Sequence, residues 1–168
     1  PMHVEAPRTG SPTHPDAEAW LRCAKRGDFA SAWRISDRIL GRHTASPDVT
    51  KPRHLRSVWT GQPLNGKRVL IRCYHGLGDT LQFIRFAPLV REIAREVSVW
   101  APSPLLPLLA SVRGIDRLLP LHDGEPDVDS DVDVEVMELP FVFRTTLGTI
   151  PRDVPYISAP PRDLPERS

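Results

Sequence analysis

Several features that assign a function directly are scarce in this sequence. Its 168 residues include two cysteines, Cys23 and Cys73, which are far apart and lie in segments expected to be helix and strand. These positions exclude a disulfide framework and a Cys-x-x-Cys metal or redox site, so we expect two reduced, buried thiols. Lys and Arg number 22 against 21 Asp and Glu, and this net charge of +1 provides no strong field to attract nucleic acid or an anionic membrane.

The sequence also has no apolar run near the roughly 20 residues that are needed to cross a bilayer. Its first residues lack the basic and then apolar layout of a signal peptide. We therefore expect no transmembrane segment and a cytoplasmic location. Peripheral association with the inner membrane stays open.

The residues that bind metals are scattered rather than grouped. None of the six histidines forms an i, i+4 pair, and the acidic stretch from Asp123 to Glu138 lacks the glycine turn and terminal glutamate of an EF-hand loop. We expect that stretch to be a solvated loop and strand edge, and we expect neither a metal site nor a cofactor.

Proline and glycine divide the chain into segments, since the 19 prolines and 10 glycines gather at the two ends and in expected loops. The expected divisions are a disordered leader (1–15), a helical hairpin (16–42), a connector with an ordered end at Val58 and Trp59 (43–66), an α/β domain (67–157), and a tail or the start of a linker (158–168).

The hairpin segment has two runs of apolar residues at helical spacing. Gly27 and Asp28 are expected to end one helix and cap the next, and Gly41 to close the second helix. The segment resembles a single TPR motif through its aromatic, turn and small residues, at Trp20, Gly27, Phe29 and Ala32. A single repeat cannot bury a continuous core, so we expect the hairpin to pack on the next domain, on further repeats or on a partner.

Residues 67–157 alternate between strand and helix patterns, which predicts an α/β fold with parallel strands and right-handed crossovers. Strands are expected at 67–73, 97–100, 117–121 and 132–136, and helices from Asp79 to Ala94, over 104–112 and near 141–147. In the last strand three valines share one face, and Asp131, Asp133 and Glu135 share the other. This alternation is typical of an edge strand with one solvated face.

The segment from His75 to Gln82 lies at the carboxyl end of the first expected strand, where open α/β sheets bind their ligands. It is not a dinucleotide fingerprint, because Leu81 stands where the third glycine belongs, and it is not a Walker loop. Asp79 occupies the electropositive helix start that a phosphate would use. From chemistry alone, helix capping is favoured over a role for Asp79 as a general base.

A longer resemblance covers about residues 16–157. The runs Trp59-Thr-Gly-Gln-Pro-Leu-Asn-Gly-Lys-Arg-Val-Leu-Ile71 and Gly76-Leu-Gly-Asp-Thr-Leu-Gln-Phe-Ile-Arg-Phe-Ala-Pro88 resemble TPR-containing glycosyltransferases related to the ADP-heptose:lipopolysaccharide heptosyltransferases of family 9. Later segments continue the likeness, at 105–109, 114–116, 138–140 and 145–156.

This resemblance implies the amino-terminal, acceptor-side half of a GT-B enzyme, with a Rossmann-like parallel sheet, no metal requirement and inversion at the anomeric carbon. It implies Asp79 as the catalytic base, and a second domain, outside this sequence, that holds the nucleotide-sugar donor. We therefore expect a truncated chain that is inactive alone and that, with its donor-binding half, transfers a sugar to a glycan, lipid or protein hydroxyl in cell-surface glycan or lipopolysaccharide assembly.

The substrate-binding residues expected on this basis are His75, Gly76, Leu77, Gly78, Thr80, Gln82 and Glu138. Relatives often carry Glu-Gln ahead of the Gly-Leu-Gly-Asp motif, whereas this sequence has Tyr74-His75. Local hydrogen bonding, and with it the acceptor, is therefore expected to differ. Arg85 and Arg144 are either contacts for an anionic acceptor or ordinary surface arginines.

The sequence leaves a second class of function open. The chain is then a non-catalytic module in which the hairpin binds a protein partner and the α/β part keeps a degenerate glycosyltransferase shape. A nucleotide-binding regulator is a weaker third hypothesis, because the phosphate-loop pattern is incomplete. The sequence does not identify the sugar, the nucleotide, the acceptor or the oligomeric state.

Overall fold

The computed structural model describes residues 15–45 and 57–159. The expected leader up to residue 14, most of the expected connector (46–56) and most of the expected tail (160–168) lie outside the described residues.

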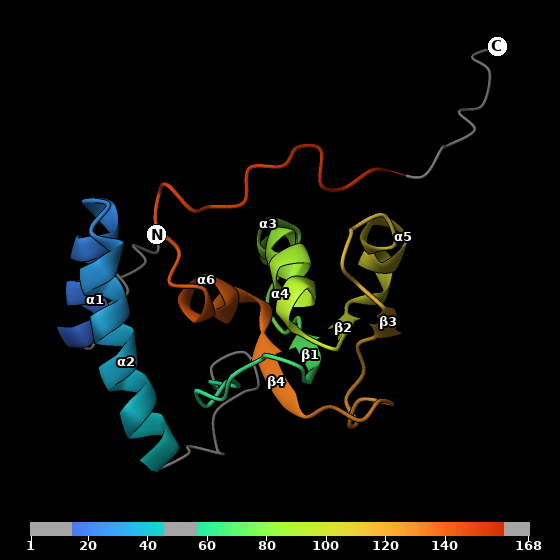
Figure 1. Cartoon of the computed structure of the whole chain (residues 1–168), viewed down its shortest axis with the longest axis horizontal. Helices are drawn as coiled ribbons and strands as arrows, with labels where there is room; N and C mark the ends of the chain where they lie inside the picture. Colours follow the sequence, from blue (N-terminus) through green and yellow to red (C-terminus); the bar gives the residue numbers. More distant parts are fainter. Residues whose placement is uncertain (1–14, 46–56, 160–168) are drawn as a thin grey trace, which may run out of the picture.

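The described chain begins with a hairpin of two helices, α1 (Pro15–Lys25) and α2 (Phe29–Ala45), which pack side by side in Figure 1. Gly27, with φ of +74°, ends α1, and the Asp28 carboxylate accepts the Ser31 N–H at 3.1 Å, so the predicted turn and cap are confirmed. The prediction that Gly41 closes the second helix is wrong. Nothing after Gly41 disfavours a helix, and the Thr44 hydroxyl donates to the carbonyls of Leu40 and Gly41 inside it.

Four parallel strands form one sheet, which confirms the predicted α/β class. They are β1 (Arg68–Arg72), β2 (Glu96–Ala101), β3 (Arg117–Pro120) and β4 (Val132–Glu135), in the spatial order β3-β2-β1-β4. Strand β1 is therefore central and pairs on one side with β2 and on the other with β4. As expected, β4 is at an edge of the sheet within the described chain.

The apolar core lies on one face of this sheet. Val69 and Ile71 stand in register with valines of β2 and β4, and all of these side chains are buried. Helices α3 (Leu77–Phe83), α4 (Ala87–Ile93) and α5 (Leu106–Leu109), drawn above the strands in Figure 1, supply the other half of the core through residues such as Val90 and Leu109. Because successive side chains of a strand alternate, Arg72 and Trp100 point to the opposite face.

The prediction of one continuous helix from Asp79 to Ala94 is wrong. The helix is broken into α3 and α4 by a 3₁₀ turn, η2 (Ile84–Phe86). Pro88 has no N–H to donate and its ring would clash with the carbonyl of the preceding turn, so it is tolerated where the chain places it, at the start of α4.

Two more expected helices differ in their bounds from the prediction. The helix expected over 104–112 is a 3₁₀ turn, η3 (Ser103–Leu105), followed by α5, and Pro107 stands in the first turn of α5. The helix expected near 141–147 begins earlier, as η4 (Val136–Glu138) and α6 (Leu139–Val142), and ends before Phe143. Pro140 stands at the start of α6, where its missing N–H costs nothing.

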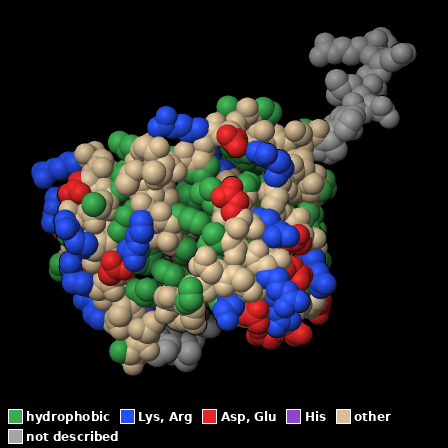
Figure 2. Space-filling view, viewed as in Figure 1, with side chains coloured by type: hydrophobic (Ala, Val, Ile, Leu, Met, Phe, Trp, Pro, Cys, Tyr) green, Lys and Arg blue, Asp and Glu red, His purple; other side chains and the backbone are tan. Residues whose placement is uncertain are grey.

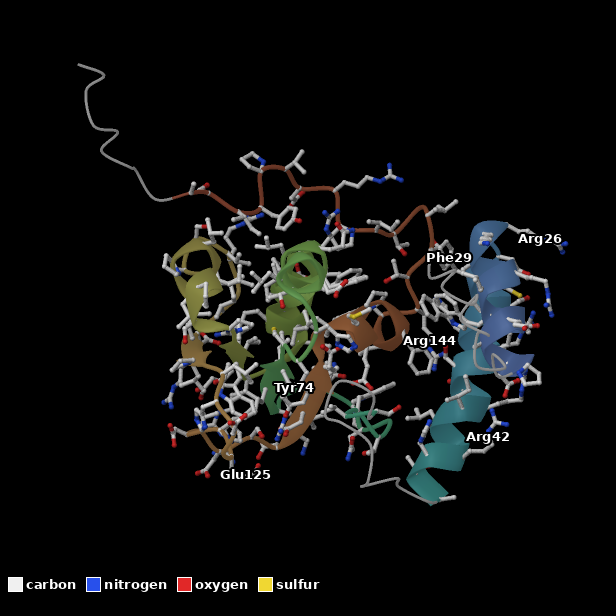
Figure 3. All side chains as sticks on the ribbon, turned by 180° about the vertical axis from the view of Figure 1, so that it is seen from behind. Arg26, Phe29, Arg42, Tyr74, Glu125 and Arg144 are labelled. Atoms are coloured by element: carbon white, nitrogen blue, oxygen red, sulfur yellow. The ribbon has the colours of Figure 1, made fainter. Side chains whose placement is uncertain are left out.

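The hairpin packs on the α/β part, which was the first of its three expected arrangements. The Trp33 indole N–H donates to the Thr145 carbonyl at 2.8 Å, and the Trp33 ring lies 5.8 Å from that of Phe141. Arg144, labelled in Figure 3, donates to the two carboxylate oxygens of Asp37 at 2.7 and 3.0 Å. Since Trp33 is buried, these contacts join the two parts through an interior and not only through surface charges.

Gly114 provides a test of how closely α4 approaches the turn before β3. Its φ is +84°, and a Cβ atom there would lie 2.8 Å from Cα of Pro88 and 3.0 Å from the Ala87 carbonyl oxygen. Gly114→Ala should therefore lower the free energy of unfolding by at least about 2 kcal/mol in urea denaturation. Gly41→Ala is the matched control, because that glycine is inside α2 with open space around it, and it should stabilise the protein by up to about 1 kcal/mol. Equal effects at the two sites would contradict this packing.

Candidate functional site

The strand order creates a switch point between β1 and β4. After β1 the chain crosses to β2 and β3 on one side of the sheet, and it then returns to β4 on the other side. In open parallel sheets, the loops at the carboxyl ends of two such strands diverge and leave a crevice for ligands. The predicted motif follows β1 directly, and Glu135 is the last residue of β4, so both stand at this point.

His75 and Glu135 meet there. The distance between His75 Nδ1 and Glu135 Oε1 is 2.9 Å, and the two side chains are 27% and 3% exposed. The second oxygen of Glu135 accepts the Met137 N–H at 2.7 Å. The expectation that Glu135 lies on a solvated strand face is wrong, because the histidine ring and the Met137 backbone cover its carboxylate. Asp133, on the same face, is half-buried and binds Arg72 and Ser130.

Asp79 lies in the first turn of α3 and is half-buried. Gly76 is the N-cap residue of this helix and has no side chain, and Asp79 follows in the first turn, where its negative charge favours the helix start without a side-chain hydrogen bond. Its Oδ2 atom lies 3.4 Å from the position that a Cβ atom on Gly76 would occupy. Within 15–45 and 57–159, no side-chain hydrogen bond or ion pair holds this carboxylate.

The other predicted motif residues divide between surface and interior. Gly76, Leu77, Gly78 and Gln82 are exposed. Thr80 faces the interior with no exposed surface, and its hydroxyl finds no hydrogen-bond partner among the described residues. A ligand at the surface could therefore contact the first group, whereas Thr80 packs inside the domain.

Of the two cysteines, Cys73 is buried as expected, next to the switch point. Burial raises the pKa of its thiol far above the usual range, so the thiol is protonated. Cys23 is half-buried in the hairpin, which corrects the expectation that both are buried, because α1 has no fully buried residue. Neither cysteine forms a disulfide.

Glu138 uses both carboxylate oxygens to hold backbone. One accepts the Val58 N–H at 3.0 Å, and the other accepts the N–H groups of Trp59 and Glu135 at 2.9 and 2.8 Å. These bonds fix the ordered end of the expected connector. Burial raises the pKa of Glu138 to about 7, because the loss of water outweighs the opposite effect of the three N–H donors. This glutamate was expected to bind substrate, and the structure shows its carboxylate bound to three backbone N–H groups.

Both candidate arginines have partners within the chain. The Arg85 guanidinium donates to the Tyr156 hydroxyl and to the Gln82 carbonyl, each at 2.9 Å, and lies 4.6 Å from the centre of the Tyr156 ring. Arg144 binds Asp37 in the hairpin. These contacts hold the 151–158 segment and the hairpin against the α/β part.

Three cavities surround these elements. Two, of about 310 and 220 Å³, lie between the hairpin and the α/β part and share Trp20, Trp33 and Met137 as walls. Figure 2 shows hydrophobic side chains gathered in the middle of the face that it displays. A third, of about 730 Å³, lies between α4 and the 151–158 segment. Asp79 and His75 line none of these three, whereas Gln82 lines the cavity of about 310 Å³ and Glu138 that of about 220 Å³, so the predicted site residues do not share one cavity.

Within the described ranges, no group of three or more His, Cys, Asp or Glu side chains is arranged to hold a metal ion. None of the helices in this part of the chain combines the length and the apolar composition that crossing a membrane requires.

Comparison with known proteins found no family model, no curated protein and no solved structure that matches this chain. The family named from the sequence therefore stays a prediction.

The raised pKa of Glu138 predicts a pH dependence of stability. Its ordinary pKa is 4.5, so between about pH 4.5 and 7 the folded state binds more protons than the unfolded state, and this group's contribution to stability falls as the pH rises. The free energy of unfolding of the wild type minus that of Glu138→Gln should therefore decrease from about pH 5 to about pH 8, as measured by urea titrations across this range. Glu125→Gln, at an exposed loop residue, is the control and should show no such trend. A difference that grows with pH would contradict the assignment.

Proposed function

We propose that the α/β part is the acceptor-side half of a GT-B glycosyltransferase, which transfers a sugar from a nucleotide-sugar donor to an acceptor hydroxyl. Two lines support this. The Gly76-Leu77-Gly78-Asp79 motif and its flanks resemble family 9 enzymes over most of the described chain. The order β3-β2-β1-β4 is that of the first four strands of a doubly wound, Rossmann-like fold. The hairpin is then the TPR-like unit of such a protein.

The observation that carries the proposal is the state of Asp79. A carboxylate in the first turn of a helix often accepts a backbone N–H, and this one makes no side-chain hydrogen bond among the described residues. It stands beside two exposed glycines, at the carboxyl end of the central strand. A carboxylate in this place suits a reaction in which an attacking hydroxyl loses a proton while positive charge grows at an anomeric carbon.

The donor is assigned to a second α/β domain, which the resemblance expects to close over this one. In this arrangement the exposed residues Gly76, Leu77, Gly78 and Gln82 shape the acceptor side of the cleft. Their backbone can approach a sugar closely at the two glycines, which have no side chain. Glu138 then acts indirectly, by holding the turn after β4.

One observation favours the non-catalytic alternative. None of the residues of α1 is buried, so this helix presents surface that a protein partner could cover. In that case the α/β part serves as the platform on which α2 docks through Trp33.

The transferase proposal predicts a large effect at Asp79. In the full-length protein, Asp79→Asn should lower kcat for sugar transfer by at least about 100-fold, with only a small fall in the melting temperature, because the lost charge favours the start of α3 but makes no side-chain hydrogen bond. The assay follows nucleotide release from a panel of nucleotide-sugars in the presence of glycan acceptors.

Asp129→Asn is the control for this experiment, since that side chain is 93% exposed in the loop before β4 and should keep full activity. Wild-type activity in Asp79→Asn would remove Asp79 from the reaction. Absence of transfer by the wild type with every donor, together with specific binding of a protein through α1, would favour the alternative.

A further inference from the structure

His75 and Glu135 form a histidine–carboxylate pair at the switch point. The imidazole comes from the loop after β1 and the carboxylate from the last residue of β4, so the pair joins the carboxyl ends of the two strands that meet at the switch point. The sequence motif contains His75, but its partner is 60 residues away and comes next to it through the parallel pairing of β1 with β4.

Glu135 is held by two contacts of its carboxylate and one of its backbone. One oxygen faces His75 Nδ1, the other accepts the Met137 N–H, and the Glu135 backbone N–H donates to Glu138. With 3% of its side chain exposed, Glu135 has no alternative partner in water. It is therefore fixed in place before any substrate arrives.

This arrangement determines the chemistry of the ring. An ionised carboxylate only accepts hydrogen bonds, so a neutral His75 carries its proton on Nδ1, and its lone pair is on Nε2. The side chain is 27% exposed although its partner is buried. The Nδ1 edge of the ring thus faces Glu135, while part of the side chain remains at the surface.

We infer that His75 is a proton-accepting catalytic residue of the proposed sugar transfer and that Glu135 is its positioning residue. This inference rests on the proposed function and adds to it a second group at the reacting centre. It also explains why a histidine stands ahead of the Gly-Leu-Gly-Asp motif, where relatives often carry glutamine.

The step balances as a single displacement. The acceptor hydroxyl gives its proton to Nε2 of His75, and its oxygen forms a bond to the anomeric carbon of the donor sugar. The bond between that carbon and the phosphate oxygen breaks, and the nucleotide leaves with the electron pair. The imidazolium that results is stabilised by the ionised Glu135 at Nδ1 and returns its proton to water.

Asp79 has a complementary part in this scheme. Its carboxylate lies against Gly76, the residue next to His75. From there its negative charge can stabilise the positive charge that develops at the anomeric carbon. Loss of either group then lowers the rate, and loss of the Glu135 carboxylate lowers it by releasing His75 and the Met137 N–H that it also holds.

The tautomer of His75 is the first test, in the full-length protein labelled with ¹⁵N-histidine, with the His75 signals assigned from the His75→Gln spectrum. Two-bond ¹H–¹⁵N correlations of the neutral ring should show the proton on Nδ1 in the wild type. In Glu135→Gln the ring should shift towards a mixture of tautomers. A proton on Nε2 in the wild type would overturn the inference, and this readout does not require activity.

Kinetics are the second test. His75→Gln should lower kcat by at least about 100-fold, and Glu135→Gln by at least about 10-fold with little change in KM. Asp131→Asn is the matched control, because that exposed carboxylate precedes the same strand at its far end and binds Arg68. Wild-type transfer that survives in His75→Gln would overturn this inference alone, whereas a wild type that transfers no sugar would overturn the proposed function.

Discussion

Two glutamates that bind each other's backbone hold the turn after β4, and the candidate site depends on this reciprocal cap. The Glu135 carboxylate accepts the Met137 N–H, and the Glu138 carboxylate accepts the Glu135 N–H. Each of the two carboxylates also makes one further set of contacts. Glu135 meets His75, and Glu138 holds the backbone of Val58 and Trp59. The same turn thus fixes the backbone that leads into the α/β part and the Glu135 side chain at the switch point. It also brings the carboxyl groups of Glu135 and Glu138 close to each other. Burial without a counter-charge is costly, and backbone N–H donors offset part of that cost.

Much of the fold could be predicted from the sequence, because its signals are local. β-Branched runs alternate with helical patterns, and this alternation predicted the four strands and their parallel pairing. Gly27 and Asp28 predicted the turn of the hairpin for the same reason. The wrong predictions of helix ends occur where the same residue is compatible with two local structures. Gly41 is acceptable within a helix as well as at its end, and Pro88 can begin a second helix instead of ending the first.

The site was predicted only on the side of β1. The glycine-rich turn and Asp79 follow that strand in the sequence, so their common location needs no tertiary information. Glu135 was missed because an alternating strand gives the same pattern whether its polar face meets water or a histidine ring. One signal was present: Glu135 and Glu138 are three residues apart before an apolar run, as in a capping box, and this spacing favours engaged carboxylates over solvated ones.

The central claim is that substrates meet at the carboxyl ends of β1 and β4. A crystal structure of the full-length protein with a nucleotide-sugar analogue and a bound acceptor tests it most directly. The account predicts that the reacting hydroxyl lies within hydrogen-bonding distance of Asp79 or His75, with the His75–Glu135 contact intact. An acceptor bound instead in the groove between α4 and the 151–158 segment, with Asp79 turned onto the amides of α3, would contradict it.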